Sequence, residues 1–344
     1  MQYTRLGNTG LIVSRLAFGS MTFGSGEGAF GSIYKVDQAG ADELVASALD
    51  AGVNFFNTAD AYANGQSELM LGKALGERRQ DVAIATKVGN RMGEALLDQG
   101  LSRQHILASV QGSLRRLGTD YIDVYLVHRL DPYTPLEETL EALNYVVRQG
   151  MVRYIGFSNW PTWLAAKAVG LQREHHWAQF RVAEMYYSLI GRDLEHEMIP
   201  FAQDAGIGIL VWSPLAGGFL SGKYTRENPG GGGGRLTGFD IIPFDREHGY
   251  DVVEKLRQIG ERHNASPAQI ALSWLLSRRA ITSVLVGASK ISQLNENLGA
   301  AELHLGTDEL AELDKLTEPT AIYPNWFNSA IYDAPVRAAL EKQG

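Results

Sequence analysis

The chain has 344 residues, 45% of them hydrophobic, which is enough to bury one large core. Acidic residues outnumber basic ones by 39 to 31, and the net charge of −8 excludes the cationic surface that nucleic acid or an anionic membrane requires. The absence of cysteine excludes disulfides and thiolate zinc sites, and the histidines show no metal-binding pattern, so no metal is expected. No apolar run approaches the length of a membrane span, and we expect a soluble, cytoplasmic protein without a membrane partner.

The first predicted element is a short β-hairpin. Residues 3–6 and 11–13 flank the turn sequence Gly7-Asn8-Thr9-Gly10, whose residue types suit a tight reversal of the chain. We interpret this hairpin as a structural plug at the bottom of the fold.

Short β-rich runs then alternate with helical patterns to the end of the chain, which is typical of parallel strands joined by helices. The predicted strands are residues 15–18, 53–56, 82–86, 122–127, 152–157, 180–183, 207–211 and 283–286. The helical patterns include residues 42–51, 68–76, 102–118, 136–149 and 195–206. Eight such pairs, with no GxGxxG after the first strand, favour an α/β (β/α)8 TIM barrel with an N-terminal β-hairpin, as a single domain over residues 1–344.

Two segments lack this periodicity. Residues 221–250 are too rich in glycine for regular structure, and we interpret them as a mobile flap near the ligand. The tail over residues 317–344 would either cover the barrel mouth or dock on the side of the barrel, and it carries the aromatic residues Tyr323, Trp326, Phe327 and Tyr332.

Polar residues directly follow several predicted strands, at the end of a barrel where active sites form. These residues are Asn57 with Tyr62, Lys87, His128, and Ser158 with Asn159. A buried lysine ammonium needs partners, and a tyrosine hydroxyl with a carboxylate or amide would provide them and be suited to proton transfer. Taken singly, each residue also has an ordinary explanation, such as a hydrogen-bonded core histidine or a solvated lysine.

Taken together, these segments resemble the aldo-keto reductase family, in its bacterial-type branch with aryl-alcohol dehydrogenases and potassium-channel β subunits. The motifs are FNTADAYANGQSE, the lysine of IATKVG, the histidine of YLVHRLDP, GFSN, WSPLAGGFLSGKY and GASKISQLNEN. The resemblance implies a TIM barrel that prefers NADP(H), also accepts NAD(H), and reduces a small-molecule aldehyde or ketone or oxidises the alcohol. A homo-oligomer is left open.

The resemblance assigns catalytic roles to four residues. Tyr62 would be the general acid, Lys87 would lower the pKa of Tyr62, and His128 would orient the carbonyl and stabilise the developing alkoxide. Asn57 stands where the family has an aspartate that pairs with the lysine, so it offers a hydrogen bond without a charge. We therefore expect the pKa values of Lys87 and Tyr62 to differ from those of the family.

The resemblance also assigns cofactor contacts. Ser158 and Asn159 would bind the nicotinamide carboxamide, Trp212 would stack on the ring, and Glu184 stands where the family uses glutamine for the same carboxamide. The pyrophosphate would lie along Ser213, Leu215, Gly217 and Lys223, although Gly217-Gly218 is also compatible with an ordinary turn. The adenosine end of the cofactor would contact the start of the helix after the last strand. The free N–H groups of that helix start and the charge of Lys290 favour a 2′-phosphate, and so NADPH over NADH. The residues assigned to this end are Gly287, Ser289, Lys290, Gln293, Glu296 and Asn297.

The substrate pocket is predicted from residues just after strand ends, namely Met21, Tyr34, Arg91, Arg129 and Trp160. Either arginine would meet an anionic or hydroxylated substrate or remain solvated. The alternative function is an NADP(H)-binding sensor or partner subunit with little turnover, which Asn57 and Glu184 keep open. The presence of a proton donor, Tyr62, argues against that alternative.

Overall fold

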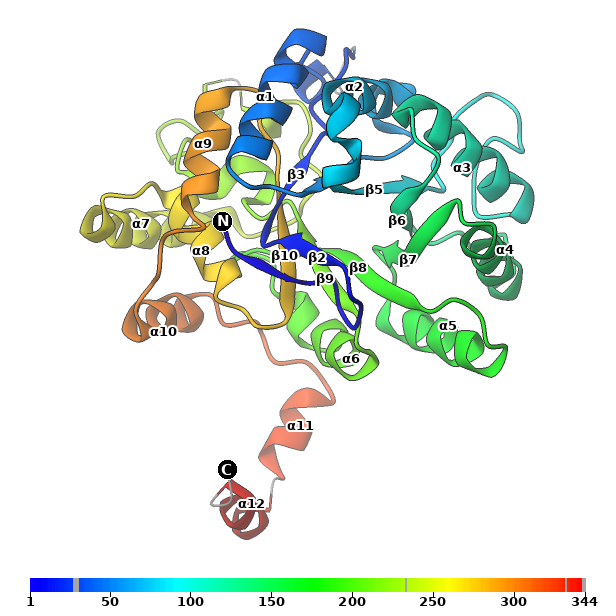
Figure 1. Ribbon diagram of the computed structural model, residues 1–344. Helices are drawn as coiled ribbons and strands as arrows, with labels where there is room; N and C mark the ends of the chain where they lie inside the picture. The colour runs from blue at the N-terminus through cyan, green and yellow to red at the C-terminus, as the bar shows by residue number, and fades with distance from the viewer. Residues whose placement is uncertain (27–30, 233, 332, 342–344) are drawn as a thin grey trace.

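Eight parallel strands close into a barrel in the computed structural model, which describes residues 1–26, 31–232, 234–331 and 333–341. Around the ring the strands follow the order β10-β3-β4-β5-β6-β7-β8-β9, and helices surround them (Figure 1). Their bounds are β3 Leu16–Gly19, β4 Phe55–Asn57, β5 Ala83–Val88, β6 Ile122–Val127, β7 Val152–Ser158, β8 Phe180–Tyr186, β9 Gly208–Trp212 and β10 Ile281–Val286. Each strand overlaps one predicted strand, so the (β/α)8 prediction is confirmed.

The α-helices of the described residues are α1 Gln38–Asp50, α2 Gln66–Leu75, α3 Arg103–Leu117, α4 Leu136–Arg148, α5 Thr162–Glu174, α6 Met198–Ala205, α7 Arg246–His263, α8 Pro267–Leu276, α9 Ile291–Gly299, α10 Thr307–Leu316, α11 Asn325–Ala330 and α12 Ala334–Glu341. Short 3-10 helices are η2 Tyr62–Gly65, η3 Gly76–Asp81, η4 Asp193–Glu195, η5 Ala216–Ser221 and η6 Arg235–Thr237. The predicted helix over residues 195–206 begins later, at Met198, because η4 forms a separate turn. Within these described ranges, none of the helices combines the length and apolarity needed to span a bilayer.

The N-terminal hairpin closes one end of the barrel, as predicted. Its strands β1 (Tyr3–Arg5) and β2 (Ile12–Ser14) pair antiparallel, and Leu6 and Val13 are fully buried against residues inside the barrel. Gly7 has a φ of +51°, and a Cβ there would lie 2.6 Å from the backbone nitrogen of Gly208. Glycine is therefore needed for the hairpin turn to rest on the start of β9.

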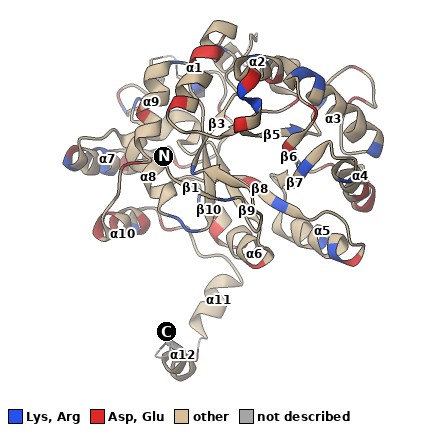
Figure 2. Cartoon of the chain, in the orientation of Figure 1, with Lys and Arg blue, Asp and Glu red and all other residues tan. Residues whose placement is uncertain are grey.

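Alternation along the strands brings the polar residues into one layer. Successive strand residues face opposite sides, and the inward-facing apolar layer includes Phe55, Ala85, Leu126, Val182 and Leu210. The next inward positions, two residues further along, are Asn57, Lys87, His128, Glu184 and Trp212. Charged residues of both signs lie along the outer helices (Figure 2).

The glycine-rich segment ends earlier than the predicted boundary at residue 250, because α7 begins at Arg246. It ends at Asp245, whose side chain accepts hydrogen bonds from the backbone of Glu247 and His248 and so starts α7. Within the segment, Leu236 is buried and its backbone nitrogen donates to the Tyr224 hydroxyl at 3.1 Å. Gly233 lies outside the described residues.

The tail does not cover the barrel mouth. Its helices α11 and α12 extend from the edge of the ring (Figure 1), and Tyr323, Trp326 and Phe327 are 72%, 51% and 46% exposed. Asn325 Nδ2 donates to the backbone oxygen of His196 at 3.2 Å, so the tail touches the side of the barrel, as the second interpretation expects. Tyr332 lies outside the described residues.

Candidate active site

The site is built around the ammonium of Lys87, a fully buried side chain in β5. Lys87 Nζ donates to Asn57 Oδ1 at 2.7 Å, to the Thr58 backbone oxygen at 2.9 Å and to the Tyr62 hydroxyl oxygen at 3.4 Å. Glu184 Oε1 lies 3.2 Å from the same nitrogen and forms an ion pair with it. Burying an ammonium is costly unless each of its N–H groups has an acceptor and its charge has a nearby anion. Asn57, Thr58 and Tyr62 provide the acceptors, and Glu184 provides the anion.

A second bond crosses the barrel. Asn57 Nδ2 donates to Glu184 Oε2 at 2.7 Å, and the two residues belong to β4 and β8, which are four strands apart in the ring of eight. The orientation of the Asn57 amide follows from chemistry, because its oxygen must face the Lys87 ammonium and its nitrogen the carboxylate. Asn57 therefore bridges the cation and the anion.

Tyr62 reaches Lys87 because the chain beyond β4 continues alongside β5. The backbone nitrogen of Thr58 donates to the oxygen of Ala85 at 2.9 Å, and that of Asp60 donates to the oxygen of Lys87 at 3.2 Å. The chain then turns at η2, where the Tyr62 nitrogen donates to the Ala59 oxygen at 3.2 Å.

Backbone strain collects around the same layer. Non-glycine residues rarely adopt positive φ, and such residues are often found at functional sites. Of the seven such residues in the described chain, five follow the strands that carry the site, namely Ala63, Asn64, Asn159, Ser213 and Ala216. The strain supports the strand ends as the functional region.

His128 lies beside Tyr62, with the ring centroids 5.7 Å apart and the planes nearly perpendicular. Asn90 Nδ2 lies 3.0 Å from His128 Nδ1, and Asn90 Oδ1 accepts from Arg129 Nε at 2.9 Å. A guanidinium only donates, so it fixes the Asn90 amide, which then donates to Nδ1 and leaves the proton of a neutral imidazole on Nε2. Burial, together with Lys87 and Arg129, lowers the pKa of His128 well below its usual value, so the ring is neutral.

Tyr62 and Lys87 both stay protonated at neutral pH. Burial raises the pKa of Tyr62, and although Lys87 opposes this, the net pKa lies above its usual value. Lys87 therefore acts on the pKa of Tyr62 in the direction that the resemblance implies, but burial outweighs it. Burial acts to lower the pKa of Lys87, but Glu184 and Tyr62 together raise it above its usual value.

Comparison with known proteins agrees with this geometry. The sequence profile described as the aldo/keto reductase family matches residues 15–318. The chain belongs to the aldo/keto reductase family. A protein named as a probable voltage-gated potassium channel subunit beta from Oryza sativa subsp. japonica is 38% identical over 88% of this chain and 92% of its own length. An uncharacterized oxidoreductase of Bacillus subtilis is 35% identical over 92% and 96%, and a versiconal hemiacetal acetate reductase of Aspergillus parasiticus is 34% identical over 94% and 99%.

In this aldo/keto reductase the residues predicted to contact nicotinamide are linked by hydrogen bonds to the polar layer around Lys87. Ser158 Oγ donates to the Glu184 backbone oxygen at 2.7 Å, and Asn159 Nδ2 donates to the backbone oxygen of His128 at 3.2 Å. Trp212 Nε1 donates to Asn159 Oδ1 at 3.0 Å. The Glu184 carboxylate faces Lys87 and Asn57, a contact that sequence reasoning missed.

The residues predicted for the rest of the cofactor lie after β9 and β10. Ser213 Oγ accepts a hydrogen bond from the Gly217 nitrogen at 2.9 Å. Leu215 directly precedes η5, and Lys223 follows it. Beyond β10, Gly287 and Ser289 lead to Lys290, which precedes the first residue of α9, and the helix carries Gln293, Glu296 and Asn297. Gln293 Oε1 accepts from the Ser289 backbone nitrogen at 3.1 Å.

Arg235 is a site residue that sequence reasoning missed. The segment around it covers the turn after β9 and leaves a cavity of about 10 Å³, lined by Trp212, Ser213, Gly217, Arg235, Leu236, Phe239, Ile241 and Ile242. Arg235 Nη2 contacts Met21 Sδ at 3.4 Å, and its charge acts on the Tyr62 hydroxyl and on Tyr34. No periodic pattern in the glycine-rich segment could have revealed this position.

The residues predicted to line the substrate pocket lie in different surroundings, some beside the candidate site and some away from it. Met21 and Tyr34 lie near Arg235, and Arg129 supports His128 through Asn90. Arg91 instead donates to backbone oxygens of its own loop, with Ala95 O at 2.7 Å. The prediction for Trp160 is wrong in the structure, because this residue is 2% exposed and stacks on Phe157 in the layer between strands and helices.

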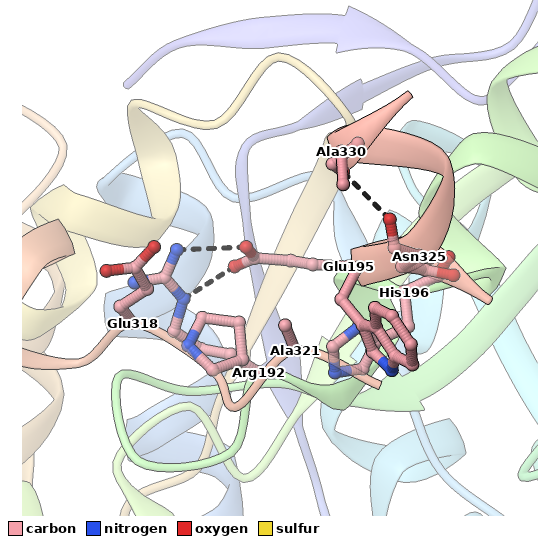
Figure 3. Close-up of a pocket in the computed structure, with 10 residues that line it drawn as sticks. Arg192, Glu195, His196, Glu318, Ala321, Asn325 and Ala330 are labelled. Carbon is pink, nitrogen blue, oxygen red and sulfur yellow. Dashed lines mark hydrogen bonds and ion pairs between the residues drawn. The ribbon is translucent and has the colours of Figure 1, made fainter. Parts of the chain in front are cut away.

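A second cavity, larger than the one beside Arg235, lies away from the strand-end residues. It has a volume of about 630 Å³ and lies between the segment after β8 and α11 (Figure 3). Its charged groups Arg192 and Glu195 form a two-pronged ion pair with distances of 2.7 and 2.9 Å. Because it contains none of the strand-end residues, we do not assign the reaction to it.

Asp60 is buried near the site but belongs to a different environment. Neither carboxylate oxygen of Asp60 has a hydrogen-bond partner among the described residues. The buried hydroxyl of Tyr125, a residue of β6, also has none. Burial and the charge of Glu68 raise the pKa of Asp60 well above its usual value. Asp60 forms no ion pair with Lys87 among the described residues, whereas Glu184 does.

We expect Asp60→Asn to change the pH dependence of stability and leave turnover unaltered. Because the folded pKa is raised, wild-type stability falls as pH rises from the unfolded pKa to the folded one, by about 1.4 kcal/mol per pH unit. The variant should lack this fall when the free energy of unfolding is measured by denaturant titration from pH 4 upward. Tyr125→Phe, a matched control, should keep the wild-type slope, and an unchanged slope in Asp60→Asn would contradict the assignment.

Proposed function

We propose that the protein reduces an aldehyde or ketone to the alcohol with NADP(H), and accepts NAD(H) less well. One observation carries the proposal: a protonated Tyr62 hydroxyl lies 3.4 Å from the buried ammonium of Lys87 and beside the neutral ring of His128. This is a proton donor with a fixed cation and a second donor, which carbonyl reduction requires. Oxidoreductases among the relatives agree with the reaction class.

The donor set after β9 suits a dinucleotide phosphate. Burial lowers the pKa of Lys223, and the nearby charges of Lys35 and Arg235 lower it further, so the three cations repel one another. None of these three cations forms an ion pair with a carboxylate in the part of the chain that the structure describes. An anion bound among them would relieve that repulsion, and a pyrophosphate has the required charge.

When bound, the nicotinamide supplies the hydride to the carbonyl carbon. The carbonyl oxygen then gains negative charge, and Tyr62 gives it a proton. His128 donates from Nε2 to the same oxygen and orients it. Lys87 donates to the Tyr62 oxygen, which leaves the phenol proton free to be transferred and stabilises the phenolate that results.

The test is consumption of NADPH and NADH by the purified protein with a panel of aldehydes, ketones, dicarbonyls and sugars. Steady turnover with several carbonyls, faster with NADPH, supports the proposal. Tight binding of NADPH without turnover would favour the second candidate, a cofactor-binding sensor or partner subunit. That candidate is supported by relatives named as probable potassium channel beta subunits at 38% and 37% identity.

Lys290→Ala should weaken NADPH binding by roughly tenfold and NADH binding little, because a charge-assisted hydrogen bond to the 2′-phosphate contributes about 1.5 kcal/mol. Lys290 precedes α9, whose free backbone N–H groups also favour a phosphate. Fluorescence titration with both cofactors measures the difference. Lys167→Ala on α5 removes the same charge elsewhere and should affect neither, whereas equal losses in Lys290→Ala would remove this residue from the phosphate site.

A further inference from the structure

We propose that Glu184 is the positioning residue that supplies the negative charge for Lys87, with Asn57 as the neutral bridge between them. The inference rests on the proposed function, since it concerns the same proton donor. In the sequence, Asn57 and Glu184 are two separate departures from what the family resemblance implies. The structure brings them into contact across the barrel, with Asn57 Nδ2 to Glu184 Oε2 at 2.7 Å.

The two departures form one exchange. The family resemblance implies a carboxylate at position 57 and an amide at position 184. In this chain the amide is at 57 and the carboxylate at 184, so the pair still holds one negative charge, one amide donor and one bond between them. Position 57 still accepts a hydrogen bond from Lys87, since Lys87 Nζ donates to Asn57 Oδ1 at 2.7 Å. What changes is the origin of the charge, which moves from β4 to β8.

The surroundings of Lys87 leave this role to Glu184. The charged and titratable groups that act on or around the ammonium are Glu184 from β8, Tyr62 after β4, His128 after β6 and Asp60. Tyr62 and His128 are neutral at pH 7, and the raised pKa of Asp60 favours its neutral form. Glu184, 3% exposed, therefore holds the one buried anion in contact with Lys87 among the described residues.

The proposal predicts that single changes at these positions harm the site and that the paired change repairs it. Glu184→Gln leaves the Lys87 ammonium buried without a counter-charge. Asn57→Asp places two carboxylates in contact, so that one of them must hold a proton at neutral pH. Asn57→Asp with Glu184→Gln restores one carboxylate and one amide with their positions reversed.

The experiment measures two properties of wild type, both single variants and the double variant. The first is the thermal unfolding of the cofactor-free protein, and the second is the pH profile of kcat for NADPH-dependent carbonyl reduction. We expect Glu184→Gln to move the alkaline limb of the profile about one to three pH units lower, because Lys87 loses its proton more readily. The double variant should recover most of the wild-type Tm and the wild-type limb.

Each outcome has a defined meaning. Additive losses in Tm, or a double variant no better than its worse parent, overturn the proposal. If Glu184→Gln fails to fold, folding of the double variant supports the proposal, and failure of both overturns it. If wild type has no turnover, the proposed function fails, while the Tm cycle still decides the charge exchange.

A buried carboxylate elsewhere provides the matched control. Asp123 pairs with Arg79 at 2.7 Å near the start of β6, away from Lys87. Asp123→Asn should lower Tm without moving the pH profile, and Asn57→Asp should not rescue it. A shift of the profile in this control would mean that any loss of a buried carboxylate moves it, which overturns the specific role of Glu184.

Discussion

Tyr62→Phe is expected to lower kcat by about 10²- to 10⁴-fold while NADPH binding stays at the wild-type level, since general acid catalysis contributes about that factor. The ring of Tyr62 still packs against His128, so the change removes the hydroxyl and little else. Stopped-flow measurement of hydride transfer with the best aldehyde of the panel gives the rate, and fluorescence titration gives the Kd.

The contrast between rate and binding decides the role of Tyr62. Wild-type turnover in Tyr62→Phe would show that another group donates the proton. Equal losses in kcat and in NADPH affinity would show that the hydroxyl maintains the shape of the site rather than acting as the acid.

Lys87→Met is expected to abolish turnover and to destabilise the fold by about 3–5 kcal/mol, because it leaves the Glu184 carboxylate buried without its cation. The loss should be smaller at pH 5 than at pH 8, since a lone buried carboxyl group can take up a proton at the lower pH. Denaturant titration at both values measures it.

A second variant separates charge from packing. Lys87→Met with Glu184→Gln removes both charges and should recover much of the stability but none of the turnover. If the double variant is as unstable as Lys87→Met, the loss of stability comes from packing around the methionine, and the ion pair contributes less to the free energy of unfolding than we expect.

The barrel could be predicted from sequence because each strand is a short apolar run with its own helix. The same alternation that buries Ala85 inside the barrel sets Lys87 in the next inward position, so the position of the polar layer follows from local spacing. The contact between Asn57 and Glu184 did not, because it joins residues 127 apart on opposite strands. A pair of this kind depends on ring closure, which no local pattern records.

The positions of side chains in the loops could not be predicted from the sequence. Trp160 follows a strand end, which suggested a pocket residue, but the chain turns toward α5 and buries the indole against Phe157. Arg235 lies in a segment where glycine removes any periodic pattern, and its contact with Met21 became visible only with the loop in place. Side-chain direction beyond a strand is decided by tertiary packing, which propensity does not encode.

The bond across the barrel also bears on how this protein can diverge or be engineered. If the charge resides on one of two facing positions, a lineage that changes one position at a time passes through a form with either two carboxylates or none beside Lys87. Both intermediates are impaired by the electrostatics described above. Replacing Asn57 by aspartate or Glu184 by glutamine, one without the other, would therefore damage the site, and the two positions should be inherited, and redesigned, together.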